Sequence, residues 1–317
     1  MEVTTSNSKL DIISIGECMI EMFCEGPLAK GETFTRTFAG DTMNMLVAAS
    51  RLGAKTGYIT RVGNDPFKKF LTESWSSEGI DLSCVTPGVS HNGLYFISIL
   101  PDGEREFTYY RSGSAASFLE PSDIIPAYIG TTKIVYASGI SQAISKSSRE
   151  AVLKAFKIAR KQNILTAFDT NLRLGLWGLQ EAREALDEIL PYVDILLPSA
   201  PEESKALFDT DRPSNVISSS LEKGVKLVVV KCGPSGAVLG FNKDVHEVAA
   251  YSPEKVVDTS GAGDVFNGAF LYCLINGMSP LESARLGTVM SGLKIRGRVS
   301  TYSIPFRDEV FDLYNKL

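Results

Sequence analysis

The sequence predicts an α/β protein built on a mostly parallel sheet, because strand-like and helix-like patterns alternate along the chain. The candidate strands are short apolar runs, as expected of strands that are buried on both faces. A chain of 317 residues is long enough to bury a large core, and no internal repeat or low-complexity tract interrupts it. These observations favour one large layered domain, with or without an appendage.

The expected elements follow one another in chain order. Leu10–Ile15 is an apolar run that ends at Gly16, which is typical of a buried first strand. Helical spacing follows within Ala39–Leu52, and Gly53 is its C-terminal stop. Further strands are expected at Thr56–Val62, Ile134–Ala137, Leu165–Phe168, Ile195–Leu197, Leu227–Val230 and Gly236–Phe241. Further helices are expected from Gly63 through Leu71 and Trp75, at Ser147–Lys161 and Gln180–Leu190, after Gly263, after Ser279 and near the C-terminus.

Two stretches do not suit a layered core. Glu17–Phe38 and His91–Arg111 alternate apolar and polar residues, and turn residues stand at Pro101-Asp102-Gly103. Both stretches predict antiparallel strands with one exposed or ligand-facing side. We expect a small β lid inserted into the α/β domain, which would keep water from a reacting group. The alternative is a peripheral hairpin without a role.

Composition excludes several classes of protein. The net charge is −5, which argues against a nucleic-acid partner. The Met1–Lys9 segment is polar, and no run of about 18 apolar residues could span a bilayer. Five scattered cysteines without CxxC spacing indicate a reducing cytoplasm, and two histidines leave little room for a His-based triad or metal cluster.

The most informative stretch is Asp258–Phe270, where Val256-Val257 is interpreted as a strand end before a glycine turn and an apolar helix. Glycines allow close backbone approach, and the free N–H groups of a first helical turn attract anions. Asp264 stands in that turn, within reach of a hydroxyl that attacks a phosphoryl group. The helix N-terminus should also favour the ionised form of Asp264. The alternative is an ordinary helix start.

The pattern D-[ST]-x-G-A-G-D-x-F-x-x-G, which ends at Gly268, resembles the second signature of the ribokinase/PfkB family of carbohydrate kinases. The resemblance implies a ribokinase-like three-layer α/β/α sandwich with a small β-sheet lid. It implies that Asp264 is the general base and that the amides of Gly261, Ala262 and Gly263 hold the transferring phosphoryl group of ATP. On this basis the α/β domain comprises residues 1–16, 39–90 and 112–317, and the lid comprises 17–38 and 91–111. Because lids of the family pair between subunits, a homo-oligomer is expected.

A second stretch, Ala39–Gly53, resembles the family's upstream signature G-G-x-x-x-N-x-A followed by R-L-G. Gly40 and Asn44 match it, whereas Ala39 and Leu46 depart from it. The resemblance implies that Gly40 lets the backbone approach the sugar and that Asp41 or Asn44 hydrogen-bonds the sugar. Asn44 could instead be a polar residue on a helix surface. With both signatures in order, the resemblance covers nearly the whole chain.

Arginines and tyrosines indicate the substrate class. Arg111 follows a lid strand, and Arg173 follows the buried strand that ends near Asp169, at the edge where α/β proteins bind ligands. Two converging arginines favour an anionic substrate, because guanidinium groups recognise carboxylates through paired hydrogen bonds. The segments that carry Tyr95, Tyr109, Arg111, Asn171 and Arg173 resemble those of 2-keto-3-deoxygluconate kinases, which bind a keto-acid. Tyr109 could instead belong to the lid core, and Arg173 could contact nucleotide phosphate.

The resemblance also suggests residues for the nucleotide and metal. Ser199 replaces the Asn of the family's N-x-x-E element, and Glu202 retains the acid that would organise Mg²⁺ through water. Glu202 could instead be an ordinary acid at a helix N-terminus. The K-x-G-x-x-G turn is matched by Lys231, Gly233 and Gly236, and the adenine pocket is placed near Ser291. Some relatives bind a monovalent cation such as K⁺ near the position of Asp258, although Arg298 stands where a small residue is usual.

The sequence therefore predicts a cytoplasmic kinase that uses ATP and Mg²⁺ to phosphorylate a primary hydroxyl of an acidic keto-sugar. The expected substrate is 2-keto-3-deoxygluconate, with its galactonate epimer as a second one, and the product is the 6-phosphate. A fructokinase or a ribokinase-like kinase of neutral sugars remains an alternative. A sugar-sensing protein without activity is another. A dinucleotide oxidoreductase is disfavoured because no GxGxxG follows the first strand.

Overall fold

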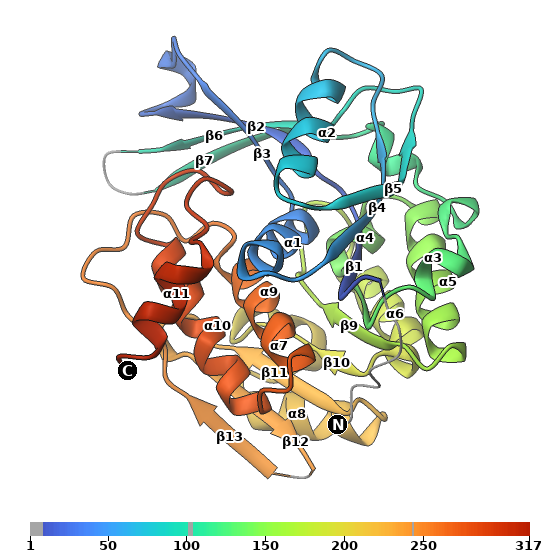
Figure 1. The fold of residues 1–317 in the computed structure, drawn as a ribbon, viewed down its shortest axis with the longest axis vertical. Coiled ribbons are helices and arrows are strands. Elements are labelled where there is room, and N and C mark those ends of the chain that lie inside the picture. The colour runs from blue at the N-terminus through green and yellow to red at the C-terminus, as the bar shows by residue number, and fades with distance from the viewer. Residues whose placement is uncertain (1–8, 101–103, 243) are drawn as a thin grey trace.

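The main sheet has nine strands in the order β13-β12-β11-β10-β9-β8-β1-β4-β5 (Figure 1). The computed structural model describes residues 9–100, 104–242 and 244–317, so the expectations for Met1–Ser8 and for the turn at Pro101-Asp102-Gly103 lie outside the described residues. The strands are β1 (Ile12–Ile15), β4 (Thr56–Val62), β5 (Asp81–Pro87), β8 (Ile134–Ser138), β9 (Leu165–Asp169), β10 (Ile195–Leu196), β11 (Leu227–Lys231), β12 (Ala237–Phe241) and β13 (Asp244–Val248). All neighbours are parallel except β11–β12 and β12–β13, which confirms the predicted mostly parallel sheet.

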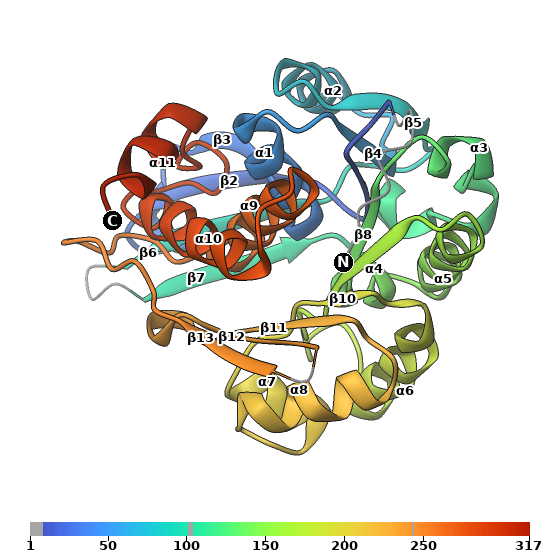
Figure 2. The same cartoon turned by 60° about the horizontal axis from the view of Figure 1, so that its bottom comes forward.

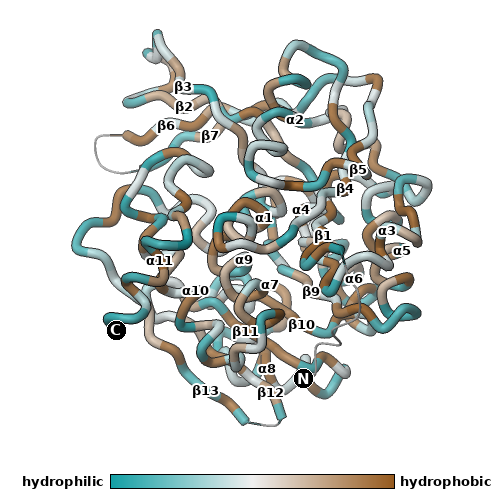
Figure 3. The backbone as a smooth tube through the Cα atoms, in the orientation of Figure 1, coloured by the Kyte–Doolittle hydropathy of each residue, from teal (hydrophilic) through white to brown (hydrophobic). Residues whose placement is uncertain are grey.

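Helices cover both faces of this sheet and complete three layers (Figure 2). Successive residues of β1 point to opposite faces, so that Ile12 joins one buried apolar cluster and Ile13 the other. The first cluster includes α1 (Asp41–Leu52), α2 (Phe67–Ser77), α9 (Ala262–Ile275), α10 (Pro280–Lys294) and α11 (Arg307–Tyr314). The opposite face carries α3 (Pro126–Ile129), α5 (Lys146–Lys161), α6 (Leu179–Ile189) and α8 (Pro213–Glu222), with α4 (Gly139–Ala143) and α7 (Glu202–Phe208) near the strand ends. Figure 3 shows hydrophobic residues gathered along the central strands.

A separate sheet of four strands, in the order β3-β2-β6-β7, stands beside the main domain. Its strands are β2 (Met19–Glu25), β3 (Thr35–Ala39), β6 (Leu94–Ile99) and β7 (Arg105–Tyr110). The outer pairs are antiparallel as expected, but β2 and β6 pair in parallel, so the antiparallel expectation was wrong for the centre of this sheet. The reason is topological: β2 follows β1 and β6 follows β5, and both leave the main sheet in the same direction.

The sequence patterns missed two strands at the edges of the main sheet, β5 and β13. Both are only partly buried, so their apolar signal is weak. Short 3₁₀ helices lie at Leu28–Lys30, Ala115–Phe118, Pro121–Asp123, Leu190–Tyr192 and Gly233–Ser235. No helix in the described part of the chain is long and apolar enough to cross a membrane.

Candidate active site

The candidate residues meet where the carboxyl ends of the central strands face the first turns of two helices. Asp169 ends β9, and Lys231 ends β11. Asp41 and Asn44 lie in the first turn of α1, and Asp264 lies in the first turn of α9. Parallel strands end at one edge of a sheet, which is where ligands bind in folds of this class.

The start of α9 has the geometry of an anion site. Gly261 is the N-cap with φ 73°, a left-handed conformation that favours glycine. The amide of Ala262 donates to Thr259 O at 3.2 Å, whereas the amides of Gly261 and Gly263 have no hydrogen-bond partner among the described residues. Two of the three predicted amides are therefore free to bind a phosphoryl group.

The residues before this turn differ from the prediction. Val256-Val257 forms no strand. Instead, the amides of Val257 and Asp258 donate to Ile295 O at 2.8 and 3.2 Å, just beyond the end of α10. The apolar pair is held by a helix end rather than by the sheet, so the expected strand end was wrong.

Asp264 is buried and sits in a negative environment. Burial is the main cause that raises its pKa to about 7, and the charges of Asp41 and Asp169 act in the same direction. The amide of Asn44 donates to Asp264 Oδ2 at 2.9 Å and, with the charge of Lys231, lowers the pKa. The helix N-terminus is expected to favour the ionised form of Asp264, but burial and the neighbouring carboxylates raise its pKa overall. A pKa near neutrality suits a general base.

Asn44 is buried, so the surface alternative for it is wrong. Its Oδ1 has no hydrogen-bond partner among the described residues. A buried carbonyl oxygen without a partner is costly, and a sugar hydroxyl could supply the missing donor.

Asp169 is the site carboxylate that the sequence patterns missed. Lys231 Nζ donates to its Oδ2 at 2.7 Å, and Asn267 Nδ2 donates to the same oxygen at 2.6 Å. A side chain added at Gly263 would stand 3.7 Å from Lys231 Nζ, so the ammonium lies beside the α9 turn. The position of Asp169 at the end of a buried strand was the one signal in the sequence that could have identified it as a site residue. The ammonium is thus placed to serve both the carboxylate and an anion on the turn.

Two adjacent acids follow β10, and Glu203, which the sequence patterns missed, is the one whose carboxylate is held by the neighbouring backbone. Glu202 is exposed at the start of α7, whereas Glu203 turns its carboxylate toward the end of β9. The amides of Ser199 and Leu172 donate to Glu203 at 2.8 and 2.7 Å, and the Thr170 hydroxyl also donates to it. Burial, and next the charge of Asp169, raise the pKa of Glu203. Adjacent helix residues point about 100° apart, which sequence spacing alone did not resolve.

Gly40 and Asp41 are positioned differently from each other. A Cβ on Gly40 would stand 2.2 Å from Glu17 O, so this glycine permits close packing of two backbone segments. Asp41 is buried, accepts a hydrogen bond from Asn171 Nδ2 at 3.3 Å, and has a raised pKa, mainly because of burial. The predicted residues Asp41 and Asn171 are therefore brought together.

Arg111 pairs with the buried carboxylate of Glu17, a partner that the sequence patterns missed. Arg111 Nε has no hydrogen-bond partner among the described residues, so one donor of the guanidinium is available. Arg111 Cζ lies 5.7 Å from the centre of the Tyr109 ring. Burial raises the pKa of Tyr109, and the charges of Arg111 and Arg173 lower it. Arg173 is exposed, and its Nη1 donates to Leu172 O at 3.0 Å.

The side chain of Tyr95 serves mainly to pack the small sheet. Its ring stacks on Tyr109 with a centroid separation of 5.4 Å, and its hydroxyl donates to the buried carboxylate of Glu21. Glu21 also accepts from the amide and the hydroxyl of Ser300, at 3.1 and 2.6 Å. The phenol of Tyr95 is therefore already engaged, and the ring of Tyr109 is the more exposed of the two.

The predicted nucleotide residues lie on several elements of the described structure, and Lys231 lies beside Gly263. Gly233 is exposed with φ 54°, in the turn between β11 and β12. Gly236 has φ 92°, and a Cβ there would stand 2.0 Å from Val248 O, so its role is to let β12 and β13 approach. Ser291 lies on α10 and donates to Thr288 O at 3.1 Å. Ser199 contributes its amide to Glu203, as described above.

The donor set fits Mg²⁺ bound together with phosphates. In the described residues no group of three His, Cys, Asp or Glu side chains could hold a metal ion alone. Mg²⁺ in phosphoryl-transfer sites is held by one or two carboxylates together with water and phosphate oxygens. Asp169 and Glu203 are two such carboxylates on neighbouring elements, close enough for each charge to act on the other.

The surroundings of Asp258 do not fit a monovalent cation. Its carboxylate is buried and accepts from the amide of Ser260 at 2.9 Å. Lys294 Nζ donates to the Asp258 carbonyl at 3.2 Å and lies 3.8 Å from Asp258 Oδ2. Arg105 Nη1 lies 3.4 Å from Asp258 Oδ1. Side-chain cations therefore already hold the oxygens expected to ligate the ion.

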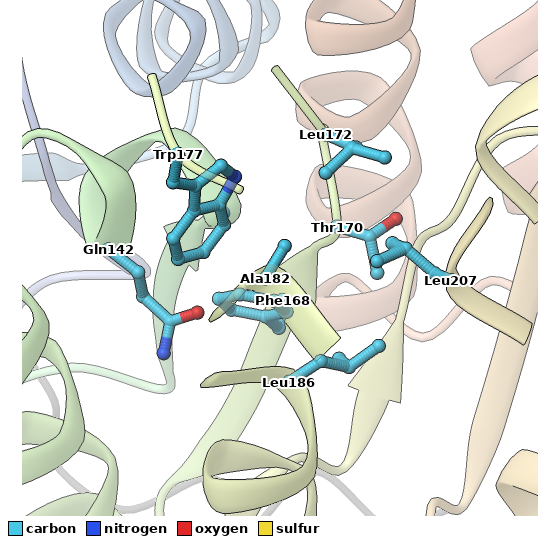
Figure 4. Close-up of a pocket in the computed structure, with 9 residues that line it drawn as sticks. Gln142, Phe168, Thr170, Leu172, Trp177, Ala182, Leu186 and Leu207 are labelled. Atoms are coloured by element: carbon cyan, nitrogen blue, oxygen red, sulfur yellow. The ribbon is translucent and has the colours of Figure 1, made fainter. Parts of the chain in front are cut away.

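A small apolar pocket lies next to the carboxyl end of β9 (Figure 4). Phe168, Trp177 and Leu186 contribute to its walls, and its volume is about 10 Å³. That is about the space that one water molecule needs, so this pocket cannot hold a sugar.

Comparison with known proteins agrees with the geometry. The model for the pfkB family carbohydrate kinases matches residues 9–307. A 2-dehydro-3-deoxygluconokinase of Thermoproteus tenax is 31% identical and covers 98% of this chain and 96% of the relative. One from Escherichia coli (strain K12) is 33% identical and covers 91% and 96%. The structure of an E. coli protein provisionally assigned as Ribokinase II, in complex with ATP and Mg²⁺, has a TM-score of 0.89 at 25% identity and covers 97% of this chain and all of that one.

The family match spans almost every described residue, including both glycine-containing signatures and the carboxylate of Asp264. The ribokinase-like fold and the predicted carbohydrate kinase activity are thereby confirmed. This chain belongs to the pfkB family of carbohydrate kinases.

Proposed function

We propose that this kinase transfers the γ-phosphoryl group of ATP to the primary hydroxyl of 2-keto-3-deoxygluconate, which is also named 2-dehydro-3-deoxygluconate. The product is the 6-phosphate, and the galactonate epimer is a second substrate. The observation that carries this proposal is the guanidinium of Arg111, which lies 5.7 Å from the centre of the Tyr109 ring and keeps a free Nε, together with the charge of Arg173, which also acts on this phenol. Two guanidinium groups near one phenol suit a substrate that carries a carboxylate. Relatives named 2-dehydro-3-deoxygluconokinase support it.

Asp264 accepts the proton of the attacking hydroxyl. Its raised pKa, about 7, makes it a stronger base than an exposed aspartate while leaving it largely ionised at slightly alkaline pH. Asn44 holds Asp264 Oδ2 through its amide group and offers its free Oδ1 to a second hydroxyl of the sugar. The two residues orient the sugar for in-line attack.

The free amides of Gly261 and Gly263 hold the oxygens of the transferring group, and Lys231 lies beside them. These donors stabilise negative charge that develops during transfer. Asp169 and Glu203 would hold Mg²⁺, which supplies neutralisation of phosphate charge when it is bound with ATP. Asn267 and Thr170 orient these carboxylates through hydrogen bonds.

The small sheet, comprising residues 17–38 and 91–111, acts as a lid over the sugar. Its outer face carries Tyr110, which is 59% exposed, beside Phe96 and Phe34. Exposed aromatic residues on a sheet of this size support pairing of two lids in a homo-oligomer. Light scattering should therefore give a mass above that of one 34.4 kDa chain. A cytoplasmic location is supported by the free state of all five cysteines.

ADP release measured in parallel with 2-keto-3-deoxygluconate, its galactonate epimer, fructose and ribose tests the substrate. We expect turnover concentrated on the two keto-acids. Preference for fructose or ribose would keep Asp264 as the base but would overturn recognition of a carboxylate by the arginines. Absence of turnover on every sugar would favour a sensor of sugars over an enzyme.

A further inference from the structure

Lys294 is the one lysine with a fully buried side chain among the described residues. It is the last residue of α10, and its side chain reaches the loop that precedes α9. Burying an ammonium group is unfavourable unless it is paired, so the groups that pair with Lys294 indicate what it does.

The partners of Lys294 are the oxygens of Asp258. Its Nζ lies 3.2 Å from the main-chain carbonyl and 3.8 Å from Oδ2 of that residue. Burial lowers the pKa of Lys294, and the carboxylates of Asp258, Glu21 and Asp264 oppose this effect. The C-terminal end of α10 adds the negative end of a helix dipole. The ammonium thus lies beside the carbonyl and the carboxylate of Asp258, in the field of three carboxylates that Arg105 only partly offsets, where a bound cation would also be favoured.

The contact lies three residues before the free amide of Gly261. The amides of Val257 and Asp258 are tied to Ile295 O, and the carboxylate of Asp258 accepts from Ser260. Lys294 adds a charged contact between the same helix end and the same loop. The position of the loop sets the position of the anion-binding amides, since only Gly261 with its left-handed φ separates the loop from α9.

We propose that Lys294 is a built-in monovalent cation, which fixes the Asp258–Gly261 loop and makes phosphoryl transfer independent of K⁺. Lys294 is a positioning residue: it touches neither the sugar nor the transferring group and acts through the loop amides. The proposal rests on transfer at Asp264 and not on which sugar accepts the phosphoryl group.

The first test compares the wild-type kinase in KCl, NaCl and tetramethylammonium chloride at equal ionic strength. We expect kcat/KM to differ by less than about threefold, because only general screening changes between these salts. Loss of most of the activity when K⁺ is replaced by tetramethylammonium would overturn the proposal.

The second test uses Lys294→Met, which removes the charge and keeps most of the volume, and Lys294→Ala, which opens a space of ammonium size. Both should lose up to about 10²-fold in kcat, approaching the loss of a direct oxyanion donor. K⁺ or methylammonium should restore Lys294→Ala but not Lys294→Met, a rescue that a purely structural lysine would not show. Failure of every cation to restore Lys294→Ala would overturn the proposal.

The matched control is Lys133→Ala. Lys133 pairs with Asp11 at 2.7 Å near the amino ends of β8 and β1, at the opposite end of the strands from the site. This variant should keep wild-type kcat and show no dependence on the cation. If the Lys294 variants fail to fold, the wild-type salt series decides alone.

A readout without sugar separates this proposal from the proposed substrate. The rise in Tm that Mg·ATP causes should be equal in K⁺ and tetramethylammonium for the wild type, and should depend on K⁺ for Lys294→Ala. If none of the sugars is turned over, the substrate proposal fails and this binding measurement still decides the role of Lys294. A wild-type Tm shift that requires K⁺ would contradict the proposal.

Discussion

The two ends of the site are built in different ways. The phosphoryl end is one continuous segment, Gly261–Asp264, whose turn and first helical residues carry both the amides and the base. The sugar end is assembled from Arg111 and Tyr109 near β7, Glu17 after β1, and Arg173 after β9. A continuous segment keeps its geometry through local backbone conformation, whereas an assembled one depends on how distant elements pack.

The difference shows in how each residue is used. Gly261 and Gly263 present free amides much as their local sequence predicts. From the sequence, Arg111 is expected to bind the substrate. In the structure its guanidinium is also paired with the buried carboxylate of Glu17, which no local pattern links to it. The phosphoryl end should therefore tolerate changes in substrate, and the sugar end should carry specificity.

The largest expected effect is at the phosphoryl end. Asp264→Ala should lower kcat by about 10²–10⁴, because it removes the group that accepts the hydroxyl proton. Steady-state kinetics with each sugar should show the same loss for every acceptor. Unchanged turnover would disprove the role of Asp264 as the base, and a loss confined to one sugar would place it at the sugar end instead.

Acid pH should act on the same residue. Asp264 works as a base only when it is deprotonated, and its pKa is raised to about 7, so activity should fall as the pH drops through that value. kcat/KM should decrease about tenfold for each pH unit below the pKa, because it reports the ionisation of the free enzyme. A profile that stays flat down to pH 5 would show that the carboxyl of Asp264 is still ionised at that pH and that burial does not raise its pKa.

Arg111→Lys probes the assembled end. It keeps the charge opposite Glu17 but removes the forked donor, which should cost about 1.5–3 kcal/mol, or roughly 10- to 150-fold, in kcat/KM for a keto-acid. Turnover of any neutral sugar should change little. Arg61→Lys is the control. Arg61 Nε lies 2.8 Å from Asp123 Oδ2, and this ion pair is remote from the site. Equal losses for acidic and neutral sugars would count against recognition of a carboxylate.

The smallest expected effect separates two adjacent acids. Glu203→Gln should weaken the response to Mg²⁺ by about 10-fold, the lower end of the range found even for groups that only orient metal ligands, because Asp169 remains to hold the ion. Glu202→Gln changes an exposed neighbour and should leave the Mg²⁺ dependence as it is. Titration of activity with Mg²⁺ compares the two variants, and a larger effect at Glu202 would reverse the assignment.

Much of the fold follows from local signals. Apolar runs placed most central strands, because a strand buried on both faces needs apolar residues on both sides. Edge strands β5 and β13 were missed since their partial burial leaves a mixed pattern. The parallel pairing of β2 with β6 was also missed, because pairing direction depends on where each strand leaves the main sheet.

The sequence by itself determined the glycine turn, the base in the first turn of α9 and the layered α/β class, because turn chemistry and hydrophobic periodicity act over a few residues. Tertiary structure alone decided that Asp169 joins the site, that Glu203 rather than Glu202 faces it, and that Lys294 occupies the surroundings of Asp258. Burial and the charges of residues distant in sequence also raised the pKa of Asp264. Desolvation and charge pairing depend on all neighbours in space, which lie far apart along the chain.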